Sequence, residues 1–278
     1  MKLATLRRDG ATVAVRLDPD GAVELPGFAD VGALLADPEW RELAARAAGR
    51  VLPVADIPSD AWAPVVPQPR KILCVGVNYR AHIAEMGREE PDFPTVFNKY
   101  PEALVGAGDP IVVPPYAADA VDWEGELAVV VGTRLHRATE EEAAAAIAGY
   151  TVLNDTSMRD WQNRTLQWLL GKSFAQSTPV GPVLVTPDEV PADARITTHV
   201  DGELMQEGRI DDLVFGPAAS LAYISQVFPL DPGDIVATGT PGGVGHARKP
   251  PRYLGDGSVV VTAIEGIGEL RNTVVVGA

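Results

Sequence analysis

The sequence predicts an α+β protein of mostly β structure, with a small N-terminal α+β domain in front of a larger, strand-rich domain. Segments typical of strands outnumber segments with helical periodicity. They also do not alternate regularly with helices, which argues against a doubly wound parallel sheet. Five prolines between residues 53 and 69 disfavour regular structure there. We therefore expect one domain over residues 1–66 and a second over residues 67–278.

Length, charge and composition limit the classes of partner. The chain has 278 residues, 46% of them hydrophobic, which is enough for a substantial core. Its net charge of −15 argues against nucleic acid or an anionic membrane surface. The single cysteine, Cys74, fits a reducing compartment, and neither a secretory signal nor a run of roughly 18 apolar residues is visible. We expect a cytoplasmic protein with a small-molecule ligand, and no membrane or nucleic-acid partner.

The first 50 residues are predicted to form a β-meander followed by a helix. Turn sequences at Asp9-Gly10 and at residues 18–21 separate three short apolar segments. The helix is expected over residues 31–48, with an interruption at Pro38 and an end at Gly49. The predicted strands are residues 2–8, 11–17 and 22–25.

The larger part is predicted to be mainly β. Thr139 and Glu142 form a capping box that opens an alanine-rich helix ending near Gly149. Residues 88–116 are rich in Pro and Gly, so we expect a loop with one short strand. The other predicted elements are strands at 71–77, 122–131, 150–153 and 234–237, a helical turn at 82–86, a hairpin around Asp201-Gly202, a helix at 218–227 and a closing strand pair within 259–276.

Two glutamates stand at the head of the apolar run that ends at Val131. Residues two apart on a strand share a face, so Glu124 and Glu126 are expected to project together. Like charges at the edge of a core need a cation or a shared proton, and a hard divalent ion such as Mg²⁺ or Mn²⁺ is the simplest remedy. Asp155, after another apolar strand, would supply a third oxygen ligand. The alternatives are glutamates that reach solvent, and turn or cap chemistry for Asp155.

His82 and Glu85 are the candidate acid–base pair. Residues three apart share a helical face, and a carboxylate bound to an imidazole orients it and raises its basicity. The same spacing also occurs on ordinary exposed helices. Glycine and proline between Gly87 and Pro94 suggest that the pair lies on a mobile lid. The other three histidines have no partner visible in the sequence and are assigned structural roles.

Three further cationic or glycine-rich features are candidates for anion binding. Lys172 is a cation in an apolar setting, so it either extends to solvent or meets an anion. Arg159 and Gln162 could share a helical face and hold a carboxylate, although a surface salt bridge also explains Arg159. The glycine-rich turn at residues 238–245 could present backbone N–H groups and a hydroxyl to an anion. It lacks the lysine and the spacing of a phosphate-binding P-loop.

Taken together, these motifs resemble the fumarylacetoacetate hydrolase family, specifically its short bacterial and mitochondrial members. The resemblance covers about residues 70–276 and rests on many ordered matches. These are Gly76-Val77-Asn78-Tyr79 with His82 and Glu85, Phe97-Asn98-Lys99, Asp122-Trp123-Glu124-Gly125-Glu126-Leu127, residues 149–155, Arg159-Asp160-Trp161-Gln162, Gly171-Lys172-Ser173-Phe174, Pro232-Gly233-Asp234, Thr238-Gly239-Thr240-Pro241 and residues 266–272. The first 65 residues match only loosely.

The resemblance implies a mixed β-roll, a homodimer, and Mg²⁺ or Mn²⁺ (with Ca²⁺ as an alternative) on the three carboxylates. It also implies that His82 and Glu85 lie on a lid that orders over the substrate. Lys172 is expected to act in catalysis. The residues expected to bind substrate are Tyr79, Arg159, Gln162, Gly239 and Thr240. Trp123 and Met158 depart from the usual tyrosine and small residue, and both flank proposed site residues.

The implied reaction is hydrolytic C–C cleavage of an acylpyruvate-type 2,4-diketo acid, such as fumarylpyruvate or acetylpyruvate. Water activated by His82 and Glu85 would attack the distal carbonyl, and the charge of the pyruvate enolate would rest on the metal ion and Lys172. The same enolate arises in decarboxylation of oxaloacetate or in proton transfer within an unsaturated keto acid. Decarboxylase and isomerase activities are therefore alternatives. A keto-acid-binding protein without catalysis is another, and His82, Glu85 and Lys172 together argue against it.

Overall fold

The structure, a computed structural model, describes residues 1–85, 87 and 89–277, without the side chains of His82 and Glu85. Most regular elements are strands. The strands are β1 (Lys2–Arg8), β2 (Ala11–Asp18), β3 (Gly21–Glu24), β4 (Val51–Leu52), β5 (Ile72–Gly76), β6 (Thr95–Lys99), β7 (Leu104–Val105), β8 (Ile111–Val113), β9 (Val121–Asp122), β10 (Gly125–Val131), β11 (Ile147–Asn154), β12 (Ser157–Met158), β13 (Thr178–Val185), β14 (Arg195–Val200), β15 (Glu203–Arg209), β16 (Ile235–Ala237), β17 (Val259–Ile264) and β18 (Gly268–Val276). The α-helices are α1 (Val31–Leu35), α2 (Trp40–Arg46), α3 (Arg80–Glu85), α4 (Glu140–Ala145), α5 (Arg159–Gln162), α6 (Leu169–Lys172) and α7 (Pro217–Ser225).

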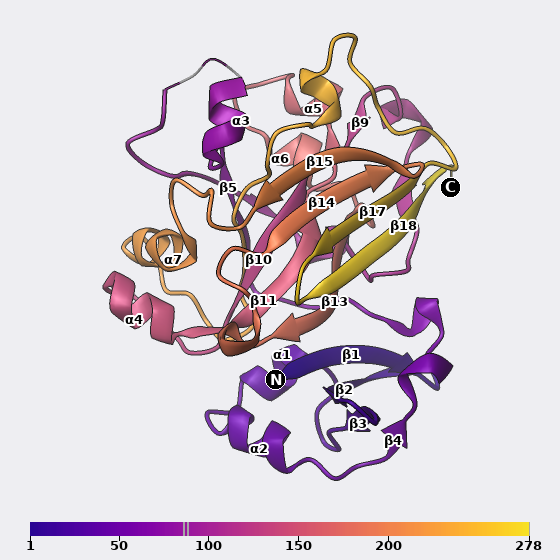
Figure 1. The fold of residues 1–278 in the computed structure, drawn as a ribbon, viewed down its shortest axis with the longest axis vertical. Helices are drawn as coiled ribbons and strands as arrows, with labels where there is room; N and C mark the ends of the chain where they lie inside the picture. The colour runs from indigo at the N-terminus through magenta and orange to yellow at the C-terminus, as the bar shows by residue number, and fades with distance from the viewer. Residues whose placement is uncertain (86, 88, 278) are drawn as a thin grey trace.

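Two mixed sheets organise these elements and confirm the predicted fold class. The larger sheet has the order β4-β3-β2-β1-β13-β11-β10-β16-β5-β6, with β7 paired to β13. The smaller sheet has the order β15-β14-β17-β18-β8. In Figure 1 the N-terminal strands lie at one end of the molecule, and α3 and α5 lie at the other. No helix among the residues described is long and apolar enough to cross a membrane.

The N-terminal meander is confirmed, and the helix after it is divided. Asp30 caps α1 by accepting a hydrogen bond from Ala33 N at 2.8 Å, and the helix stops before Pro38. The second helix ends at Arg46, earlier than predicted. Its C-cap is Ala47 rather than Gly49, and Gly49 lies where the chain passes close to the carbonyl of Glu24.

The N-terminal strands also join the larger sheet. Strand β1 pairs antiparallel with β13, with Leu3 opposite Leu184, so one sheet spans both predicted domains. Leu3 and Leu34 share a buried cluster with Ile72 and Leu184. The division into residues 1–66 and 67–278 stays a prediction, and the core crosses it.

Strand β10 is buried along its whole length because layers cover both of its faces. Val129 and Val131 pack in a cluster with residues of α4 and α7, whereas Ala128 and Val130 belong to the cluster shared with the N-terminal part. The smaller sheet packs over β10, β11 and β13 through Leu127 and its neighbours. Because both faces of β10 are covered, its sequence is a continuous apolar run rather than an alternation of apolar and polar residues.

Two predicted stretches differ from the structure. Residues 88–116 contain three strands rather than one, because β6, β7 and β8 each pair with a strand distant in sequence. The capping box of Thr139 and Glu142 is confirmed, but α4 ends at Ala145 rather than near Gly149. Residues 147–149 instead begin β11, where pairing with β10 overrides the helix propensity of the alanines.

Candidate active site

Three carboxylates meet where β10 begins and β11 ends. These strands are antiparallel, with Gly125 opposite Asn154, so Glu124 and Asp155 lie side by side, and Asp155 N donates to Glu124 O at 2.8 Å. Glu124, Glu126 and Asp155 are buried, and one carboxylate oxygen from each lies within 4.8 Å of the others. The structure therefore brings together the three predicted ligands, and solvent-exposed glutamates are excluded.

The backbone around this cluster is held by the smaller sheet. Asn154 Oδ1 accepts a hydrogen bond from Glu124 N at 3.1 Å, and Asn154 Nδ2 donates to Thr262 Oγ1 at 2.9 Å. Gln206 Oε1 accepts from Gly125 N at 3.0 Å. Thr262 comes from β17 and Gln206 from β15, so packing of the second sheet positions the carboxylates.

Lys172 meets anions rather than solvent. Its Nζ donates to Glu124 Oε2 and to Asp155 Oδ2, each at 2.7 Å, and only 2% of the residue surface is exposed. Lys99, which the sequence analysis did not assign to the site, donates to Asp155 Oδ1 at 2.6 Å. Two buried ammonium groups therefore hold Asp155 from both sides.

Arg159 bridges two carboxylates and a neighbouring amide. Its Nη2 lies 2.6 Å from Glu124 Oε1 and 2.7 Å from Asp122 Oδ2, and its Nη1 donates to Gln162 Oε1 at 2.9 Å. The predicted shared face of Arg159 and Gln162 is confirmed by this contact, and a surface salt bridge is excluded by burial. Asp122 is a second site residue that the sequence analysis did not single out.

Burial and charge shift the pKa values of the cluster in opposite directions. Burial raises the pKa of Asp155, but the ammonium groups of Lys172 and Lys99 outweigh it and hold that pKa at about 2. Burial lowers the pKa of Lys172, and the nearby carboxylates more than offset it, so its pKa is raised. Burial, followed by repulsion from Asp155 and Glu124, raises the pKa of Glu126 well above its usual value.

When all of its carboxylates are ionised, the charges of the site do not cancel, and this is the test of whether a cation fits. Four buried carboxylates (Asp122, Glu124, Glu126 and Asp155) face three buried cationic side chains (Lys99, Arg159 and Lys172). Within the described part of the chain Glu126 forms no ion pair, and its Oε2 accepts a hydrogen bond from Gly239 N at 2.8 Å. An all-oxygen donor set with excess negative charge fits a hard divalent ion.

The glycine-rich turn contacts the protein's own groups. Gly239 has φ +99° and directs its N–H to Glu126. Thr240 Oγ1 donates to Gly125 O at 2.9 Å and accepts from Gln206 Nε2 at 2.8 Å. The turn thus positions the strand that carries the glutamates, and both Gly239 and Thr240 also line the pocket.

A pocket of about 290 Å³ opens over Glu124 and Glu126. One wall is aromatic, where Trp168 meets Phe97 edge to face with ring centroids 5.3 Å apart. The other lining residues include Val75, Gly76, Val77, Arg159, Gln162, Asn163, Lys172, Gly239, Thr240, Val244, His246 and Ala247. The sequence analysis assigned His246 a structural role, but His246 lines this pocket. No signal in the sequence marks it, because no motif or partner residue accompanies this histidine.

Tyr79, His82 and Glu85 belong to the segment around α3. Asn78 Nδ2 donates to Thr238 O at 2.8 Å, which fixes the start of this segment beside the glycine-rich turn. Tyr79 is fully buried and does not line the pocket, and its hydroxyl has no hydrogen-bond partner among the residues described. His82 and Glu85 lie in the helix, and their side chains lie outside the described part of the structure.

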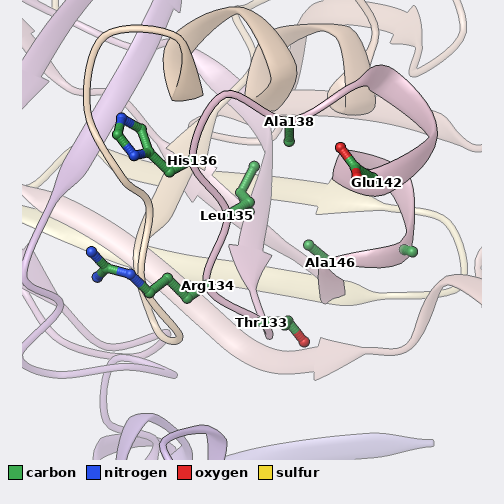
Figure 2. A pocket seen from close by; sticks show the side chains of 8 residues that line it. Thr133, Arg134, Leu135, His136, Ala138, Glu142 and Ala146 are labelled. Atoms are coloured by element: carbon green, nitrogen blue, oxygen red, sulfur yellow. The ribbon is translucent and has the colours of Figure 1, made fainter.

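A second pocket lies beside α4 and does not share this chemistry. Figure 2 shows Arg134, Leu135, His136 and Glu142 among the side chains that line it. Glu142 there is engaged in the capping box, where its Oε2 accepts from Thr139 N at 2.8 Å. Among the described residues, the one cluster of three possible metal ligands is that of Glu124, Glu126 and Asp155.

Comparison with known proteins finds relatives that match most of this chain. Among curated relatives, the mitochondrial oxaloacetate tautomerase FAHD2B of Bos taurus is 43% identical over 234 residues, which is 83% of this chain and 74% of the relative. The mitochondrial oxaloacetate tautomerase FAHD2A of Homo sapiens is 42% identical over 237 residues, which is 84% of this chain and 75% of the relative. Both relatives are mitochondrial by name, so the cytoplasmic location stays a prediction.

Solved structures match over the whole chain. The 5-carboxymethyl-2-hydroxymuconate delta-isomerase from Mycobacterium smegmatis has a TM-score of 0.82 and 33% identity, with 100% of both chains covered. The fumarylacetoacetate hydrolase from Exiguobacterium antarcticum has a TM-score of 0.83 and 34% identity, also with 100% of both chains covered. The family model described as fumarylacetoacetate (FAA) hydrolase C-terminal matches residues 71–275. The chain therefore belongs to the fumarylacetoacetate hydrolase family.

Proposed function

We propose that the protein is an enzyme that moves a proton between the enol and keto forms of a 2-keto acid of the oxaloacetate type. The observation that carries this proposal is the buried Glu124–Glu126–Asp155 cluster, in which the Lys172 ammonium contacts two members and Glu126 has no ion pair among the described residues. The names of the relatives, oxaloacetate tautomerases, and of an isomerase among the solved structures support it. They favour an isomerase-type reaction over the C–C hydrolysis that the sequence analysis put first.

The proposed cofactor is Mg²⁺ or Mn²⁺, held by Glu124, Glu126 and Asp155. When bound, such an ion supplies an electrophile beside the keto acid and favours negative charge on its keto oxygen. The donor set is all carboxylate, which suits these hard ions better than softer metals.

The side chains of the pocket then orient the substrate and handle its charge. Arg159 and Gln162 lie together in the lining, so we assign to them the carboxylate of the keto acid. Lys172 is held with a raised pKa and stays protonated, so it stabilises enolate charge rather than removing a proton. Proton transfer at carbon 3 needs a base within hydrogen-bond reach, and His82 with Glu85 on α3 remains the assignment made from sequence.

Hydrolysis of an acylpyruvate is the second candidate. It is supported by the hydrolase from Exiguobacterium antarcticum among the matching structures. Both reactions develop negative charge on the oxygen at carbon 2, and entry of water at the distal carbonyl would separate them. Decarboxylation of oxaloacetate releases the same pyruvate enolate as the hydrolysis.

One assay separates these candidates. The purified chain with Mg²⁺ is given freshly dissolved enol-oxaloacetate and, separately, acetylpyruvate and fumarylpyruvate, with enol absorbance, pyruvate and carbon dioxide measured in parallel. We expect loss of oxaloacetate enol absorbance faster than in buffer, with neither pyruvate nor carbon dioxide released at that rate. Pyruvate from the diketo acids would favour hydrolysis, and carbon dioxide with pyruvate from oxaloacetate would favour decarboxylation. Binding of these acids without turnover of any would leave the protein as a keto-acid binder.

A homodimer is part of the proposal. Apolar side chains around α5 and α6 are exposed, with Leu166, Leu170 and Tyr116 at 96%, 59% and 69% exposure. Exposed large apolar side chains such as these, of which Tyr116 and Leu170 line one surface hollow, are typical of an interface. Light scattering after size exclusion should give twice the chain mass, and a monomer at micromolar concentration would contradict the proposal.

A further inference from the structure

His246 stands at the edge of the pocket in the turn Gly245–Ala247. Its side chain is exposed, and its Nδ1 lies 2.9 Å from the hydroxyl of Tyr253. The other ring nitrogen, Nε2, makes no hydrogen bond to any of the residues described. A hydroxyl that donates to Nδ1 places the ring proton on Nε2, which then is a hydrogen-bond donor available to a ligand.

The backbone of this turn is fixed by the same carboxylate that holds Arg159. Asp122 Oδ1 accepts from Gly245 N at 2.7 Å, and Asp122 Oδ2 accepts from His246 N at 3.0 Å. Asp122 Oδ2 also accepts from Arg159 Nε at 2.8 Å. A side chain at Gly245 would overlap the carbonyl of Arg252, so the chain passes too closely for any other residue. His246 is therefore held in a defined place relative to the carboxylate cluster.

The lining of the pocket combines acidic and uncharged groups. Glu124 and Glu126 are the proposed ligands of the ion, whereas Asn163 and His246 line the same pocket and do not belong to the carboxylate cluster. A 2-keto acid whose carboxylate and keto oxygen face the ion directs its remaining atoms away from the glutamates. A distal carboxylate that enters the pocket gives up part of its hydration, so a hydrogen-bond donor in the lining stabilises it.

We propose that His246 Nε2–H binds the distal carboxylate of a 2-keto-dicarboxylic acid, with Tyr253 as the positioning residue for the imidazole. His246 then sets the preference for dicarboxylic over monocarboxylic substrates. This inference rests on the proposed function for the placement of the keto-acid end of the substrate. It adds a specificity-determining residue that no sequence motif indicated.

The test compares oxaloacetate with its C4 methyl ester, which keeps the skeleton and lacks the distal charge. In His246→Ala we expect kcat/KM for enol-oxaloacetate to fall about tenfold to one-hundredfold, mainly through KM, the range for loss of one hydrogen bond to a charged group. For the ester we expect less than a twofold change. Tyr253→Phe should lower the oxaloacetate value in the same direction by a smaller factor. His136→Ala, an exposed histidine of the second pocket, is the matched control and should change neither value.

A binding measurement keeps the inference testable if no tautomerisation is found. Calorimetry with Mg²⁺ compares 2-oxoglutarate with 2-oxovalerate, which have similar length but differ in the distal carboxylate. A wild-type preference for 2-oxoglutarate that disappears in His246→Ala supports the inference even if the proposed reaction fails. The inference is overturned if His246→Ala loses the same factor in kcat/KM or in affinity for both ligands of a pair. It is also overturned if the variant loses nothing for either ligand.

Discussion

Replacement of Glu126 by Gln tests whether the cluster is built for a cation. Glu126 is 2% exposed, has no ion pair among the described residues, and lies within 4.8 Å of two other carboxylates. When Glu126 and one neighbour are both ionised, their charges at that separation repel by about 3.5 kcal/mol at an effective dielectric constant of 20, and this repulsion contributes to the raised pKa of Glu126. Lys172 offsets part of this repulsion. Glutamine has nearly the same shape and can keep the hydrogen bond from Gly239.

We therefore expect Glu126→Gln to be more stable than the wild type in EDTA, by about 1–2 kcal/mol after the offset from Lys172. For a chain of this size the melting temperature should rise by about 2–4 °C. In Mg²⁺ the wild type should be more stable than Glu126→Gln. At a hundred times its Kd, a ligand that binds only the folded state adds about 2.7 kcal/mol, and the variant has lost one of the three proposed ligands.

The assay is thermal and urea unfolding of both proteins in EDTA and in a series of Mg²⁺ concentrations. Glu124→Gln is the matched control, because Glu124 pairs with Lys172 and Arg159. Loss of a partner from such buried pairs should destabilise the protein by about 3–5 kcal/mol in EDTA. The reasoning is refuted if Glu126→Gln is less stable than the wild type in EDTA, or if it keeps the full Mg²⁺ shift.

Three other predictions follow from the described contacts. Lys172→Met should abolish turnover and lower metal-free stability by about 3–5 kcal/mol in urea unfolding, and unchanged turnover would remove Lys172 from the mechanism. Gly76→Ala places a Cβ 2.6 Å from the Trp168 ring, so displacement of that wall should raise KM more than it lowers kcat, and unchanged kinetics would contradict the assigned wall. Burial raises the pKa of Asp231, but its hydrogen bonds and charge contacts with Lys71 and Arg134 outweigh burial and lower that pKa. The ionised carboxylate therefore stabilises the folded protein above the usual aspartate pKa, and this stabilisation is lost as pH falls. Acid unfolding of Asp231→Asn by circular dichroism should show a weaker loss over that range, and an identical pH profile would contradict it.

Much of the site follows from local sequence pattern. Glu124 and Glu126 project together because they stand two apart at the head of a strand, and Arg159 meets Gln162 because they stand three apart on one helical turn. The meander and the Asp201-Gly202 hairpin follow from their turn residues. Each of these relations joins residues close in the chain, where backbone geometry alone sets the distance.

Contacts between segments far apart in the sequence could not be predicted from local sequence patterns. Lys99 reaches Asp155 because β6 joins the larger sheet beside β5, and no periodicity around Lys99 indicates that partner. The helix predicted to continue to Gly149 is shortened because strand pairing with β10 supplies more hydrogen bonds and burial than a further helical turn. His246 enters the pocket because Asp122, more than 100 residues earlier, accepts its backbone N–H.

The sequence by itself determined the mostly β class, the carboxylates and the family resemblance, because strand alternation, turn chemistry and ordered motifs are properties of neighbouring residues. Only the tertiary structure decided that three cationic side chains face four buried carboxylates. It also decided that Glu126 is the carboxylate without an ion pair among the described residues, and that the N-terminal strands extend the main sheet. These features depend on which distant elements pack together, since charge balance in a buried site is a sum over all the segments that enclose it.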